Sequence, residues 1–251
     1  MEHAVKHAVI TMRERFWEPL TLDDLAHSVM LSKYHFLRVF SRVTGVTPGR
    51  FLTAVRLQEA KRLLLSTSFN VAEVAVRVGY SSTGSFTRRF TELVGLSPTQ
   101  YRKLSLGADS VAPAPLVPKA CVPGPVTPST GSVTGRLRTT GAVLETACVA
   151  AFHGAMPQGV PASWDNACAP GRFTLARVPT GTWYIHAVAR GSDGDGSTDP
   201  DRTVFMATVG PVHVKDGITA HLLDFPLSPV DWTRPPILSA LMGIDPQPMA
   251  A

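Results

Sequence analysis

One helix-sized segment occurs twice in this chain, and the repeat constrains the fold more than any other feature of the sequence. The two copies begin at Ser32 and Ser82, at an offset of 50 positions. Serine, phenylalanine, arginine, phenylalanine, glycine and proline match at Ser32/Ser82, Phe36/Phe86, Arg38/Arg88, Phe40/Phe90, Gly45/Gly95 and Pro48/Pro98. The preceding Leu25-Ala26 matches Val74-Ala75 at an offset of 49. Such self-similarity indicates a repeated unit, here a short helix, a tight turn and a second helix.

The second copy has the pattern of an amphipathic helix. Phe86, Phe90 and Leu93 recur at the i, i+4 and i+7 spacing of a buried helical stripe. Ser82 is suited to cap the first turn, and Gly95 is suited to the left-handed conformation that ends a helix. The face opposite the phenylalanines carries Thr83, Gly84, Thr87 and Arg88, with Arg89 at its edge. A short basic helix with small hydroxyl residues at its start suits the DNA major groove.

The sequence around the two copies predicts five further helices. Apolar spacing predicts helices over 4–17 and 48–65, and Ser97-Pro98 predicts another that runs to 104. Thr21 and Asn70 are each followed at the third position by an acid, which indicates a capping box at the start of a short helix. In the helix over 48–65, Arg50, Arg56, Lys61 and Arg62 are expected on the polar side. The first hundred residues are therefore predicted to form an all-α domain.

The positive charge of the chain is concentrated in the half that carries the repeat. Residues 1–104 contain 15 Lys+Arg and 8 Asp+Glu, a net charge of +7. Residues 105–251 contain 9 Lys+Arg and 11 Asp+Glu, a net charge of −2. A basic helical half indicates a polyanion as its partner.

These residues resemble the DNA-binding domain of the AraC/XylS family of bacterial transcription regulators. The resemblance covers about residues 5–104 and is carried by Ser32-x3-Phe36-x-Arg38-x-Phe40, Arg56-Leu57-x2-Ala60, Val74-Ala75-x3-Gly79-Tyr80 and Phe86-x-Arg88-x-Phe90-x4-Gly95-x-Ser97-Pro98. It implies two helix-turn-helix subdomains joined by the helix over 48–65, with recognition helices in successive major grooves about 34 Å apart. The family usually places this domain last, so its arabinose-type sensing barrel is not implied here.

The resemblance also implies which residues contact DNA. The residues that would face bases are Lys33, Tyr34, Leu37 and Arg38 in the first helix, and Thr83, Gly84, Thr87 and Arg88 in the second. Arg38 and Arg88 are the strongest candidates, because a guanidinium can bind guanine O6 and N7 together. Leu37 offers only apolar contact and Gly84 offers none. The phosphates would bind helix amides near Ser32 and Ser82 and the side chains of Arg42, Arg50, Arg89 and Arg102.

The second half changes from helical to strand periodicity. A proline-rich linker is predicted over 105–130, and a proline-rich tail over 229–251. Between them, alternating residues predict strands over 132–139, 146–152, 172–178, 182–190, 204–212 and 217–225. We interpret 131–228 as an all-β sandwich of six or seven strands. Segments 133–137, 171–175 and 178–184 resemble transthyretin-like, carboxypeptidase-regulatory-like sandwich modules.

Residues with chemical potential in the second half are scattered. The alternating acids of 193–199 resemble the start of a calcium loop but lack its sixth-position glycine and twelfth-position glutamate. His153, His186, His213 and His221 fall on or beside different expected strands, and core packing is the favoured role of Trp164, Trp183 and Phe173. Cys121, Cys148 and Cys168 have no metal or disulfide spacing. We therefore expect no enzyme activity, cofactor or metal.

Together these patterns predict a sequence-specific transcription regulator, an activator by resemblance. Double-stranded DNA is the expected partner and RNA polymerase a candidate partner, and the β-sandwich is a candidate for binding a small-molecule effector or for self-association. The N-terminus has no signal-peptide core and no long apolar run is present, which favours a cytoplasmic protein without a membrane partner. Two alternatives stay open: a DNA-modification or repair protein, and an adaptor or architectural protein with low sequence specificity.

Overall fold

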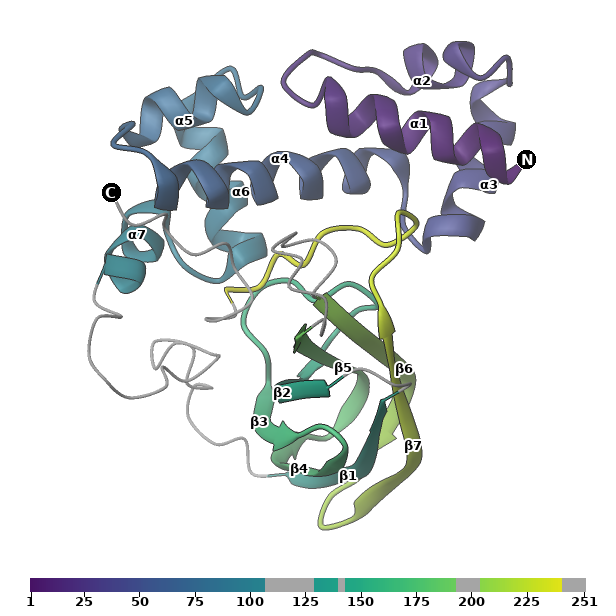
Figure 1. Cartoon of the computed structure of the whole chain (residues 1–251), viewed down its shortest axis with the longest axis vertical. Helices are drawn as coiled ribbons and strands as arrows, with labels where there is room; N and C mark the ends of the chain where they lie inside the picture. The colour runs from purple at the N-terminus through teal and green to yellow at the C-terminus, as the bar shows by residue number, and fades with distance from the viewer. Residues whose placement is uncertain (107–128, 140–142, 193–203, 241–251) are drawn as a thin grey trace. The chain divides into compact units, whose positions relative to one another are not determined.

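The computed structural model describes residues 1–106, 129–139, 143–192 and 204–240, which form two compact units (Figure 1). Among these residues, the helical unit comprises 1–106 together with Asp231–Leu238, and the β unit comprises 129–230 and 239–240. The predicted linker lies mostly outside the described residues, as do the acidic segment over 193–199 and the end of the predicted tail.

The helical unit consists of helices where the sequence predicts them. They are α1 (Glu2–Glu14), α2 (Leu22–Ser28), α3 (Lys33–Thr44), α4 (Pro48–Ser66), α5 (Val71–Arg77), α6 (Thr83–Val94) and α7 (Pro98–Leu106). In Figure 1 the long α4 runs between two groups, with α1, α2 and α3 toward one end and α5, α6 and α7 toward the other. The predicted pair of helix-turn-helix motifs, α2–α3 and α5–α6, is thereby confirmed.

Both motifs begin with the capping boxes that the sequence predicts. The backbone N–H of Asp24 donates to Thr21 Oγ1 at 3.1 Å, and the backbone N–H of Thr21 donates to Asp24 Oδ2 at 2.9 Å. Asn70 and Glu73 form the same reciprocal pair at 3.0 and 2.7 Å. Each box satisfies two N–H groups that a helix start would otherwise leave unpaired. Local sequence therefore fixes where α2 and α5 begin.

The repeat builds the same aromatic core twice. Phe36, Phe40 and Phe51 are fully buried, and their ring centroids are 5.5 and 5.6 Å apart along the series. In the second half Phe86, Phe90 and Tyr101 repeat the series at 5.6 and 5.7 Å. Ring pairs at such distances contribute about 0.5–1.5 kcal/mol beyond the burial of their area. Helices α3 and α6 are thus each held to the following helix by tilted and edge-to-face ring contacts on their inner faces.

Lys61 departs from the expectation that it lies on the polar side of α4. Its side chain is completely buried, and Nζ donates to the carbonyls of Ile237 at 3.3 Å and Leu238 at 3.5 Å. The ammonium also lies 5.8 Å from the centroid of the Tyr101 ring. A buried charge needs such partners, because water is not available to solvate it. The segment Asp231–Leu238, which belongs to the helical unit, supplies them.

The β unit contains seven strands in its described residues. They are β1 (Thr130–Thr139), β2 (Val143–Phe152), β3 (Ser163–Cys168), β4 (Gly171–Pro179), β5 (Gly181–Ser192), β6 (Val204–Val214) and β7 (Thr219–Pro229). Six match the predicted strands. The additional strand, β3, has the sequence Ser-Trp-Asp-Asn-Ala-Cys, whose short polar residues disfavour a strand by local propensity. It forms because it pairs with β2 from Thr146–Cys168 to Ala151–Ser163.

The strands form one sheet in the order β3-β2-β5-β6-β7-β1-β4, and this sheet curls into a nearly closed barrel. Two hydrogen bonds join the edge strands β3 and β4. Ser163 Oγ donates to the Ala176 carbonyl at 2.7 Å, and the Thr174 N–H donates to Asp165 Oδ2 at 2.9 Å. Strand β7 pairs in parallel with β1 and, at its end, antiparallel with β6. The predicted all-β class is confirmed, but the predicted sandwich form is not.

The inward face of this sheet carries a continuous apolar core. Phe173 and Phe225 are buried with ring centroids 5.8 Å apart, and Trp183 donates Nε1–H to the Pro179 carbonyl at 2.7 Å. Small side chains fill much of the remaining space, including Ala147, Ala151, Ala187, Ala189 and Ala207. Phe173 and Trp183 are therefore core residues, as favoured from the sequence.

Candidate nucleic-acid interface

Helices α3 and α6 are built alike and present their outer faces to solvent. Each has 12 residues and begins at a serine cap, where Ser32 Oγ accepts from the His35 N–H at 3.4 Å and Ser82 Oγ accepts from the Ser85 N–H at 3.2 Å. Each ends at a left-handed glycine, with φ of 75° at Gly45 and 91° at Gly95. The two serine hydroxyls are thus engaged in capping.

The expected base-facing side chains lie on these outer faces. Those that are exposed are Lys33, Tyr34 and Arg38 on α3, and Thr83, Gly84 and Arg88 on α6. Leu37 and Thr87 are half-buried at the edges of the same faces. Tyr34 is 77% exposed, which is unusual for a large aromatic ring, and Lys33 Nζ lies 5.9 Å from its centroid. An exposed tyrosine next to a lysine is suited to contact with bases or sugars.

The expected phosphate-binding side chains differ in their surroundings. Arg42 is exposed at the end of α3, and Arg50 is exposed in the first turn of α4. Arg89 is exposed too, but its Nη1 pairs with Glu92 Oε2 at 3.2 Å. Lys33 lies 3.7 Å from Asp23 of α2. Because all these ion pairs are solvent-exposed, they leave the side chains able to exchange a carboxylate for a phosphate at little cost.

Arg102, which is expected to contact phosphate, makes hydrogen bonds within the helical unit. Its Nε donates to the Leu64 carbonyl at 2.9 Å and its Nη2 to the Phe69 carbonyl at 2.6 Å, and the side chain is half-buried. These carbonyls belong to the end of α4 and the loop that leads to α5. Arg102 therefore braces the loop in front of the second motif.

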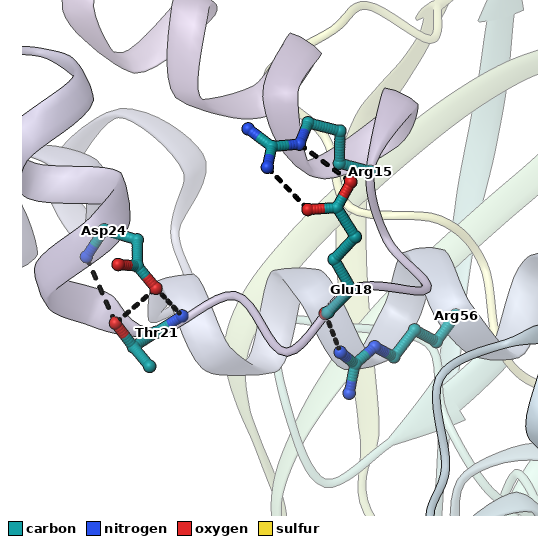
Figure 2. Close-up of polar contacts among 5 residues, drawn as sticks. All are labelled: Arg15, Glu18, Thr21, Asp24 and Arg56. Carbon is teal, nitrogen blue, oxygen red and sulfur yellow. Dashed lines mark hydrogen bonds and ion pairs between the residues drawn. The ribbon is translucent and has the colours of Figure 1, made fainter.

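Arg56 braces the corresponding loop of the first half. Its Nε donates to the Phe16 carbonyl at 2.7 Å. Its Nη2 donates to the Glu18 carbonyl, also at 2.7 Å (Figure 2). Burial lowers the pKa of the Arg56 guanidinium from its ordinary value, an effect opposed by the nearby Tyr80. The same loop is closed by Arg15, whose Nε donates to Glu18 Oε1 at 3.0 Å. The Arg15 side chain holds the pKa of the Glu18 carboxyl below its ordinary value.

Sequence reasoning did not identify these two braces. Arg56 and Arg102 meet carbonyls 33–40 positions away, so no local pattern reveals the contact. A helical arginine that falls near the buried stripe, as both do, was the only available signal. The braces matter to the site because each loop they hold enters a capping box and then a recognition helix.

The turn inside each motif needs a left-handed residue at the same place. Met30 has φ of 55° in the first turn, and Gly79 has φ of 82° in the second. A Cβ on Gly79 would lie 2.7 Å from the Trp17 carbonyl oxygen, so only glycine fits there. Met30 is 94% exposed, so the first turn accommodates a side chain that points into solvent. Both turns hold the recognition helix at a fixed angle to the helix before it.

Three histidines on strands of the β unit form hydrogen bonds within that unit. His186 is buried between Thr208 Oγ1 and the Gly154 carbonyl, each at 3.0 Å, while His213 and His221 contact Thr182 and Thr134. Among the described residues, no three His, Cys, Asp or Glu side chains lie close enough together to hold a metal ion. Burial, with a smaller effect of Asp165, raises the pKa of the Cys148 thiol to about 12. Its thiolate is therefore strongly disfavoured.

Comparisons with known proteins locate the similarity in the helical unit. Residues 25–104 match the family model described as a helix-turn-helix domain. The chain is 33% identical over 102 residues to the Transposon Tn10 TetD protein of Escherichia coli, a match that covers 41% of this chain and 74% of that protein. The chain belongs to the AraC/XylS family of DNA-binding transcription regulators.

Two longer relatives match this chain over about a third of their own length. The Melibiose operon regulatory protein of Escherichia coli K12 is 35% identical over 92 residues, which is 37% of this chain and 30% of that protein. The Lactose operon transcription activator of Staphylococcus xylosus is 30% identical over 98 residues, or 39% of this chain and 35% of that protein. The match thus spans about a third of the length of these relatives. In the described part of the chain, no helix is both long and apolar enough to cross a membrane.

Proposed function

We propose that this AraC/XylS member is a sequence-specific transcription regulator whose α3 and α6 read two adjacent major grooves. The observation that carries the proposal is the placement of two equivalent helices on one long helix, each with an arginine exposed at the same position, Arg38 and Arg88. An arginine at such a place can bind guanine O6 and N7 together and so distinguish one base pair. The excess of basic residues in 1–104 supplies attraction to phosphates.

An activating role is the second part of the proposal. The Staphylococcus xylosus relative, which matches 98 residues of this chain, is named a transcription activator. The β unit would then bind an effector or a second copy of the chain, and RNA polymerase would be the partner at the promoter. A reporter gene placed behind the selected DNA site tests this role, and a fall in transcript on expressing the protein would indicate a repressor.

Selection of bound sequences from random duplex DNA with the full chain tests the specific reading. We expect a motif of two blocks about 10 base pairs apart, because successive major grooves on one face have that spacing. Substitution Arg88→Ala should cost about 1–3 kcal/mol of discrimination at one or two base positions. The charge-matched control is Arg13→Ala, since Arg13 is exposed at the end of α1 and outside both motifs.

Two outcomes would contradict the proposal. Equal weakening on every sequence by Arg88→Ala would remove Arg88 from base reading. A steep salt dependence without any enriched motif would favour an architectural protein of low specificity, the alternative that Leu37 and Gly84 support because neither can hydrogen-bond to a base edge.

A further inference from the structure

Helices α3 and α6 share a scaffold, so a difference in what they bind must come from their outer side chains. Their lengths, serine caps, terminal glycines and buried phenylalanines correspond at an offset of 50 positions. The two outer faces can therefore be compared position by position, because the two helices differ mainly in the side chains at corresponding positions.

The first difference is charge. Helix α3 carries Lys33, Arg38 and Arg42 and contains no acidic residue. Helix α6 carries Arg88 and Arg89, but Glu92 occupies the position that corresponds to Arg42. The side chains of Arg89 and Glu92 are 50% and 58% exposed and pair at 3.2 Å. Although Lys33 has Asp23 of α2 nearby, α3 has a formal excess of three positive charges from Lys and Arg and α6 has an excess of one.

The second difference is the number of side chains that reach outward. Where α3 has the exposed Lys33 and Tyr34, α6 has Thr83 and Gly84. A Cβ at Gly84 would meet no atom within 4 Å, and the residue does not have a positive φ. Neither packing nor backbone conformation therefore requires glycine at this position. The outer face of α6 lacks a side chain at a place where the fold would accept one.

We propose that the two motifs divide the recognition of DNA unequally. Helix α3 supplies most of the base discrimination and of the attraction to phosphates, and α6 reads its groove weakly through Thr83, Thr87 and Arg88. This inference rests on the proposed function and adds the form of the binding site. The preferred duplex is asymmetric, with one strongly specified block and one degenerate block about 10 base pairs away.

Sequence selection with the full chain and two variants tests the division. In the unsubstituted protein one block should carry most of the sequence information. Repeating the selection with Arg38→Ala and with Arg88→Ala assigns each block to its helix, and the stronger block should be the one that Arg38→Ala degrades. A missing motif would overturn both the proposed function and the division, whereas two equal blocks, or a stronger block assigned to Arg88, would overturn the division alone.

Two reciprocal charge substitutions test the phosphate part on the selected duplex. Glu92→Arg gives α6 the residue that α3 has, and should steepen the slope of log K against log salt by about 1. Arg42→Glu gives α3 the residue that α6 has, and should flatten that slope by at least about 1. Both side chains are exposed, so urea unfolding should be nearly unchanged. An unchanged salt slope in both variants would overturn the unequal attraction.

The open position in α6 provides a gain-of-function test. Gly84→Gln places an amide on the outer face, and glutamine can bind adenine N6 and N7 together. The weak block should then prefer one base by roughly tenfold, consistent with the discrimination of a good bidentate contact. The control is Gly84→Ala, which adds helix propensity without a hydrogen-bonding group. If Gly84→Gln sharpens the weak block no more than Gly84→Ala does, Gly84 is not the missing contact and this part of the inference fails.

Discussion

In the helical unit, loops are fixed by individual side chains, whereas in the β unit the strands are fixed mainly by their own main chains. Arg56 donates to two loop carbonyls, Arg102 donates to one carbonyl at the end of α4 and one in the following loop, and two capping boxes hold the helices that follow. The seven described strands are joined by main-chain hydrogen bonds between neighbouring strands. A polar substitution should therefore disturb the helical unit more than the β unit, while the loss of a core ring should disturb both.

The largest expected effect is the loss of stability when a core aromatic ring is removed, and it should be about equal in the two units. Phe90→Ala and Phe225→Ala each remove a fully buried ring that contacts a neighbouring aromatic ring. Each should cost about 3–5 kcal/mol of its unit's unfolding free energy, because the lost burial is accompanied by a cavity. Hydrogen exchange of peptides from α6 and from β7 measures each loss in its own unit. A loss below about 1 kcal/mol in either unit would mean that its core can collapse around the missing ring.

Two arginine substitutions, one in each unit, should differ in their cost to the free energy of unfolding. Arg102→Met leaves the Leu64 and Phe69 carbonyls without this donor and should cost about 1–3 kcal/mol. Arg138→Met removes an ion pair with Asp224 whose side chains are 61% and 50% exposed, and should cost less than about 1 kcal/mol. Urea midpoints of the full chain compare the two, with Arg102→Lys as an intermediate control. Equal costs would argue against the contrast between the units.

The smallest expected effect is an acid sensitivity of the first capping box. Hydrogen bonds from the Thr21 hydroxyl and backbone N–H lower the pKa of the Asp24 carboxyl below its ordinary value of 3.8. Because the folded pKa is the lower one, the stabilisation is present above pH 3.8 and is lost as the pH falls through the folded pKa. Thr21→Ala should return the pKa of Asp24 toward 3.8, which an NMR titration measures. An Asp24 that titrates unchanged in Thr21→Ala would exclude the hydroxyl as the cause.

The sequence predicts the features of the helical unit that depend on neighbours along the chain. Helix starts at Thr21, Asn70 and Ser82 and the end at Gly95 follow from caps within four residues, and each is found where expected. The outer positions of α3 and α6 follow from the same periodicity. Burial of Lys61 could not be predicted this way, because its carbonyl partners lie 176 and 177 positions away.

In the β unit, alternation identifies strands but not how the sheet closes. Each strand has one apolar face both in a sandwich and in a barrel. The alternating sequence pattern is therefore the same for the two forms and cannot distinguish them. The closure depends on the short polar strand β3, which its own residues disfavour, and on β7, which pairs with two different strands. Both features are determined by partners far along the chain.

Helix α4 also sets a phase between the two recognition helices. Its 19 residues form one uninterrupted rod, about 28 Å long at 1.5 Å per residue. Each residue added or removed within it would turn the second motif by about 100° relative to the first. The distance between the two motifs and their relative rotation are thereby coupled. The motifs are joined by a helix and not by a flexible loop, so the protein could not adapt to a DNA site whose two blocks were a few base pairs further apart. Under the proposed function, new sites would therefore be reached by changing side chains on α3 and α6, with the distance between the blocks held constant.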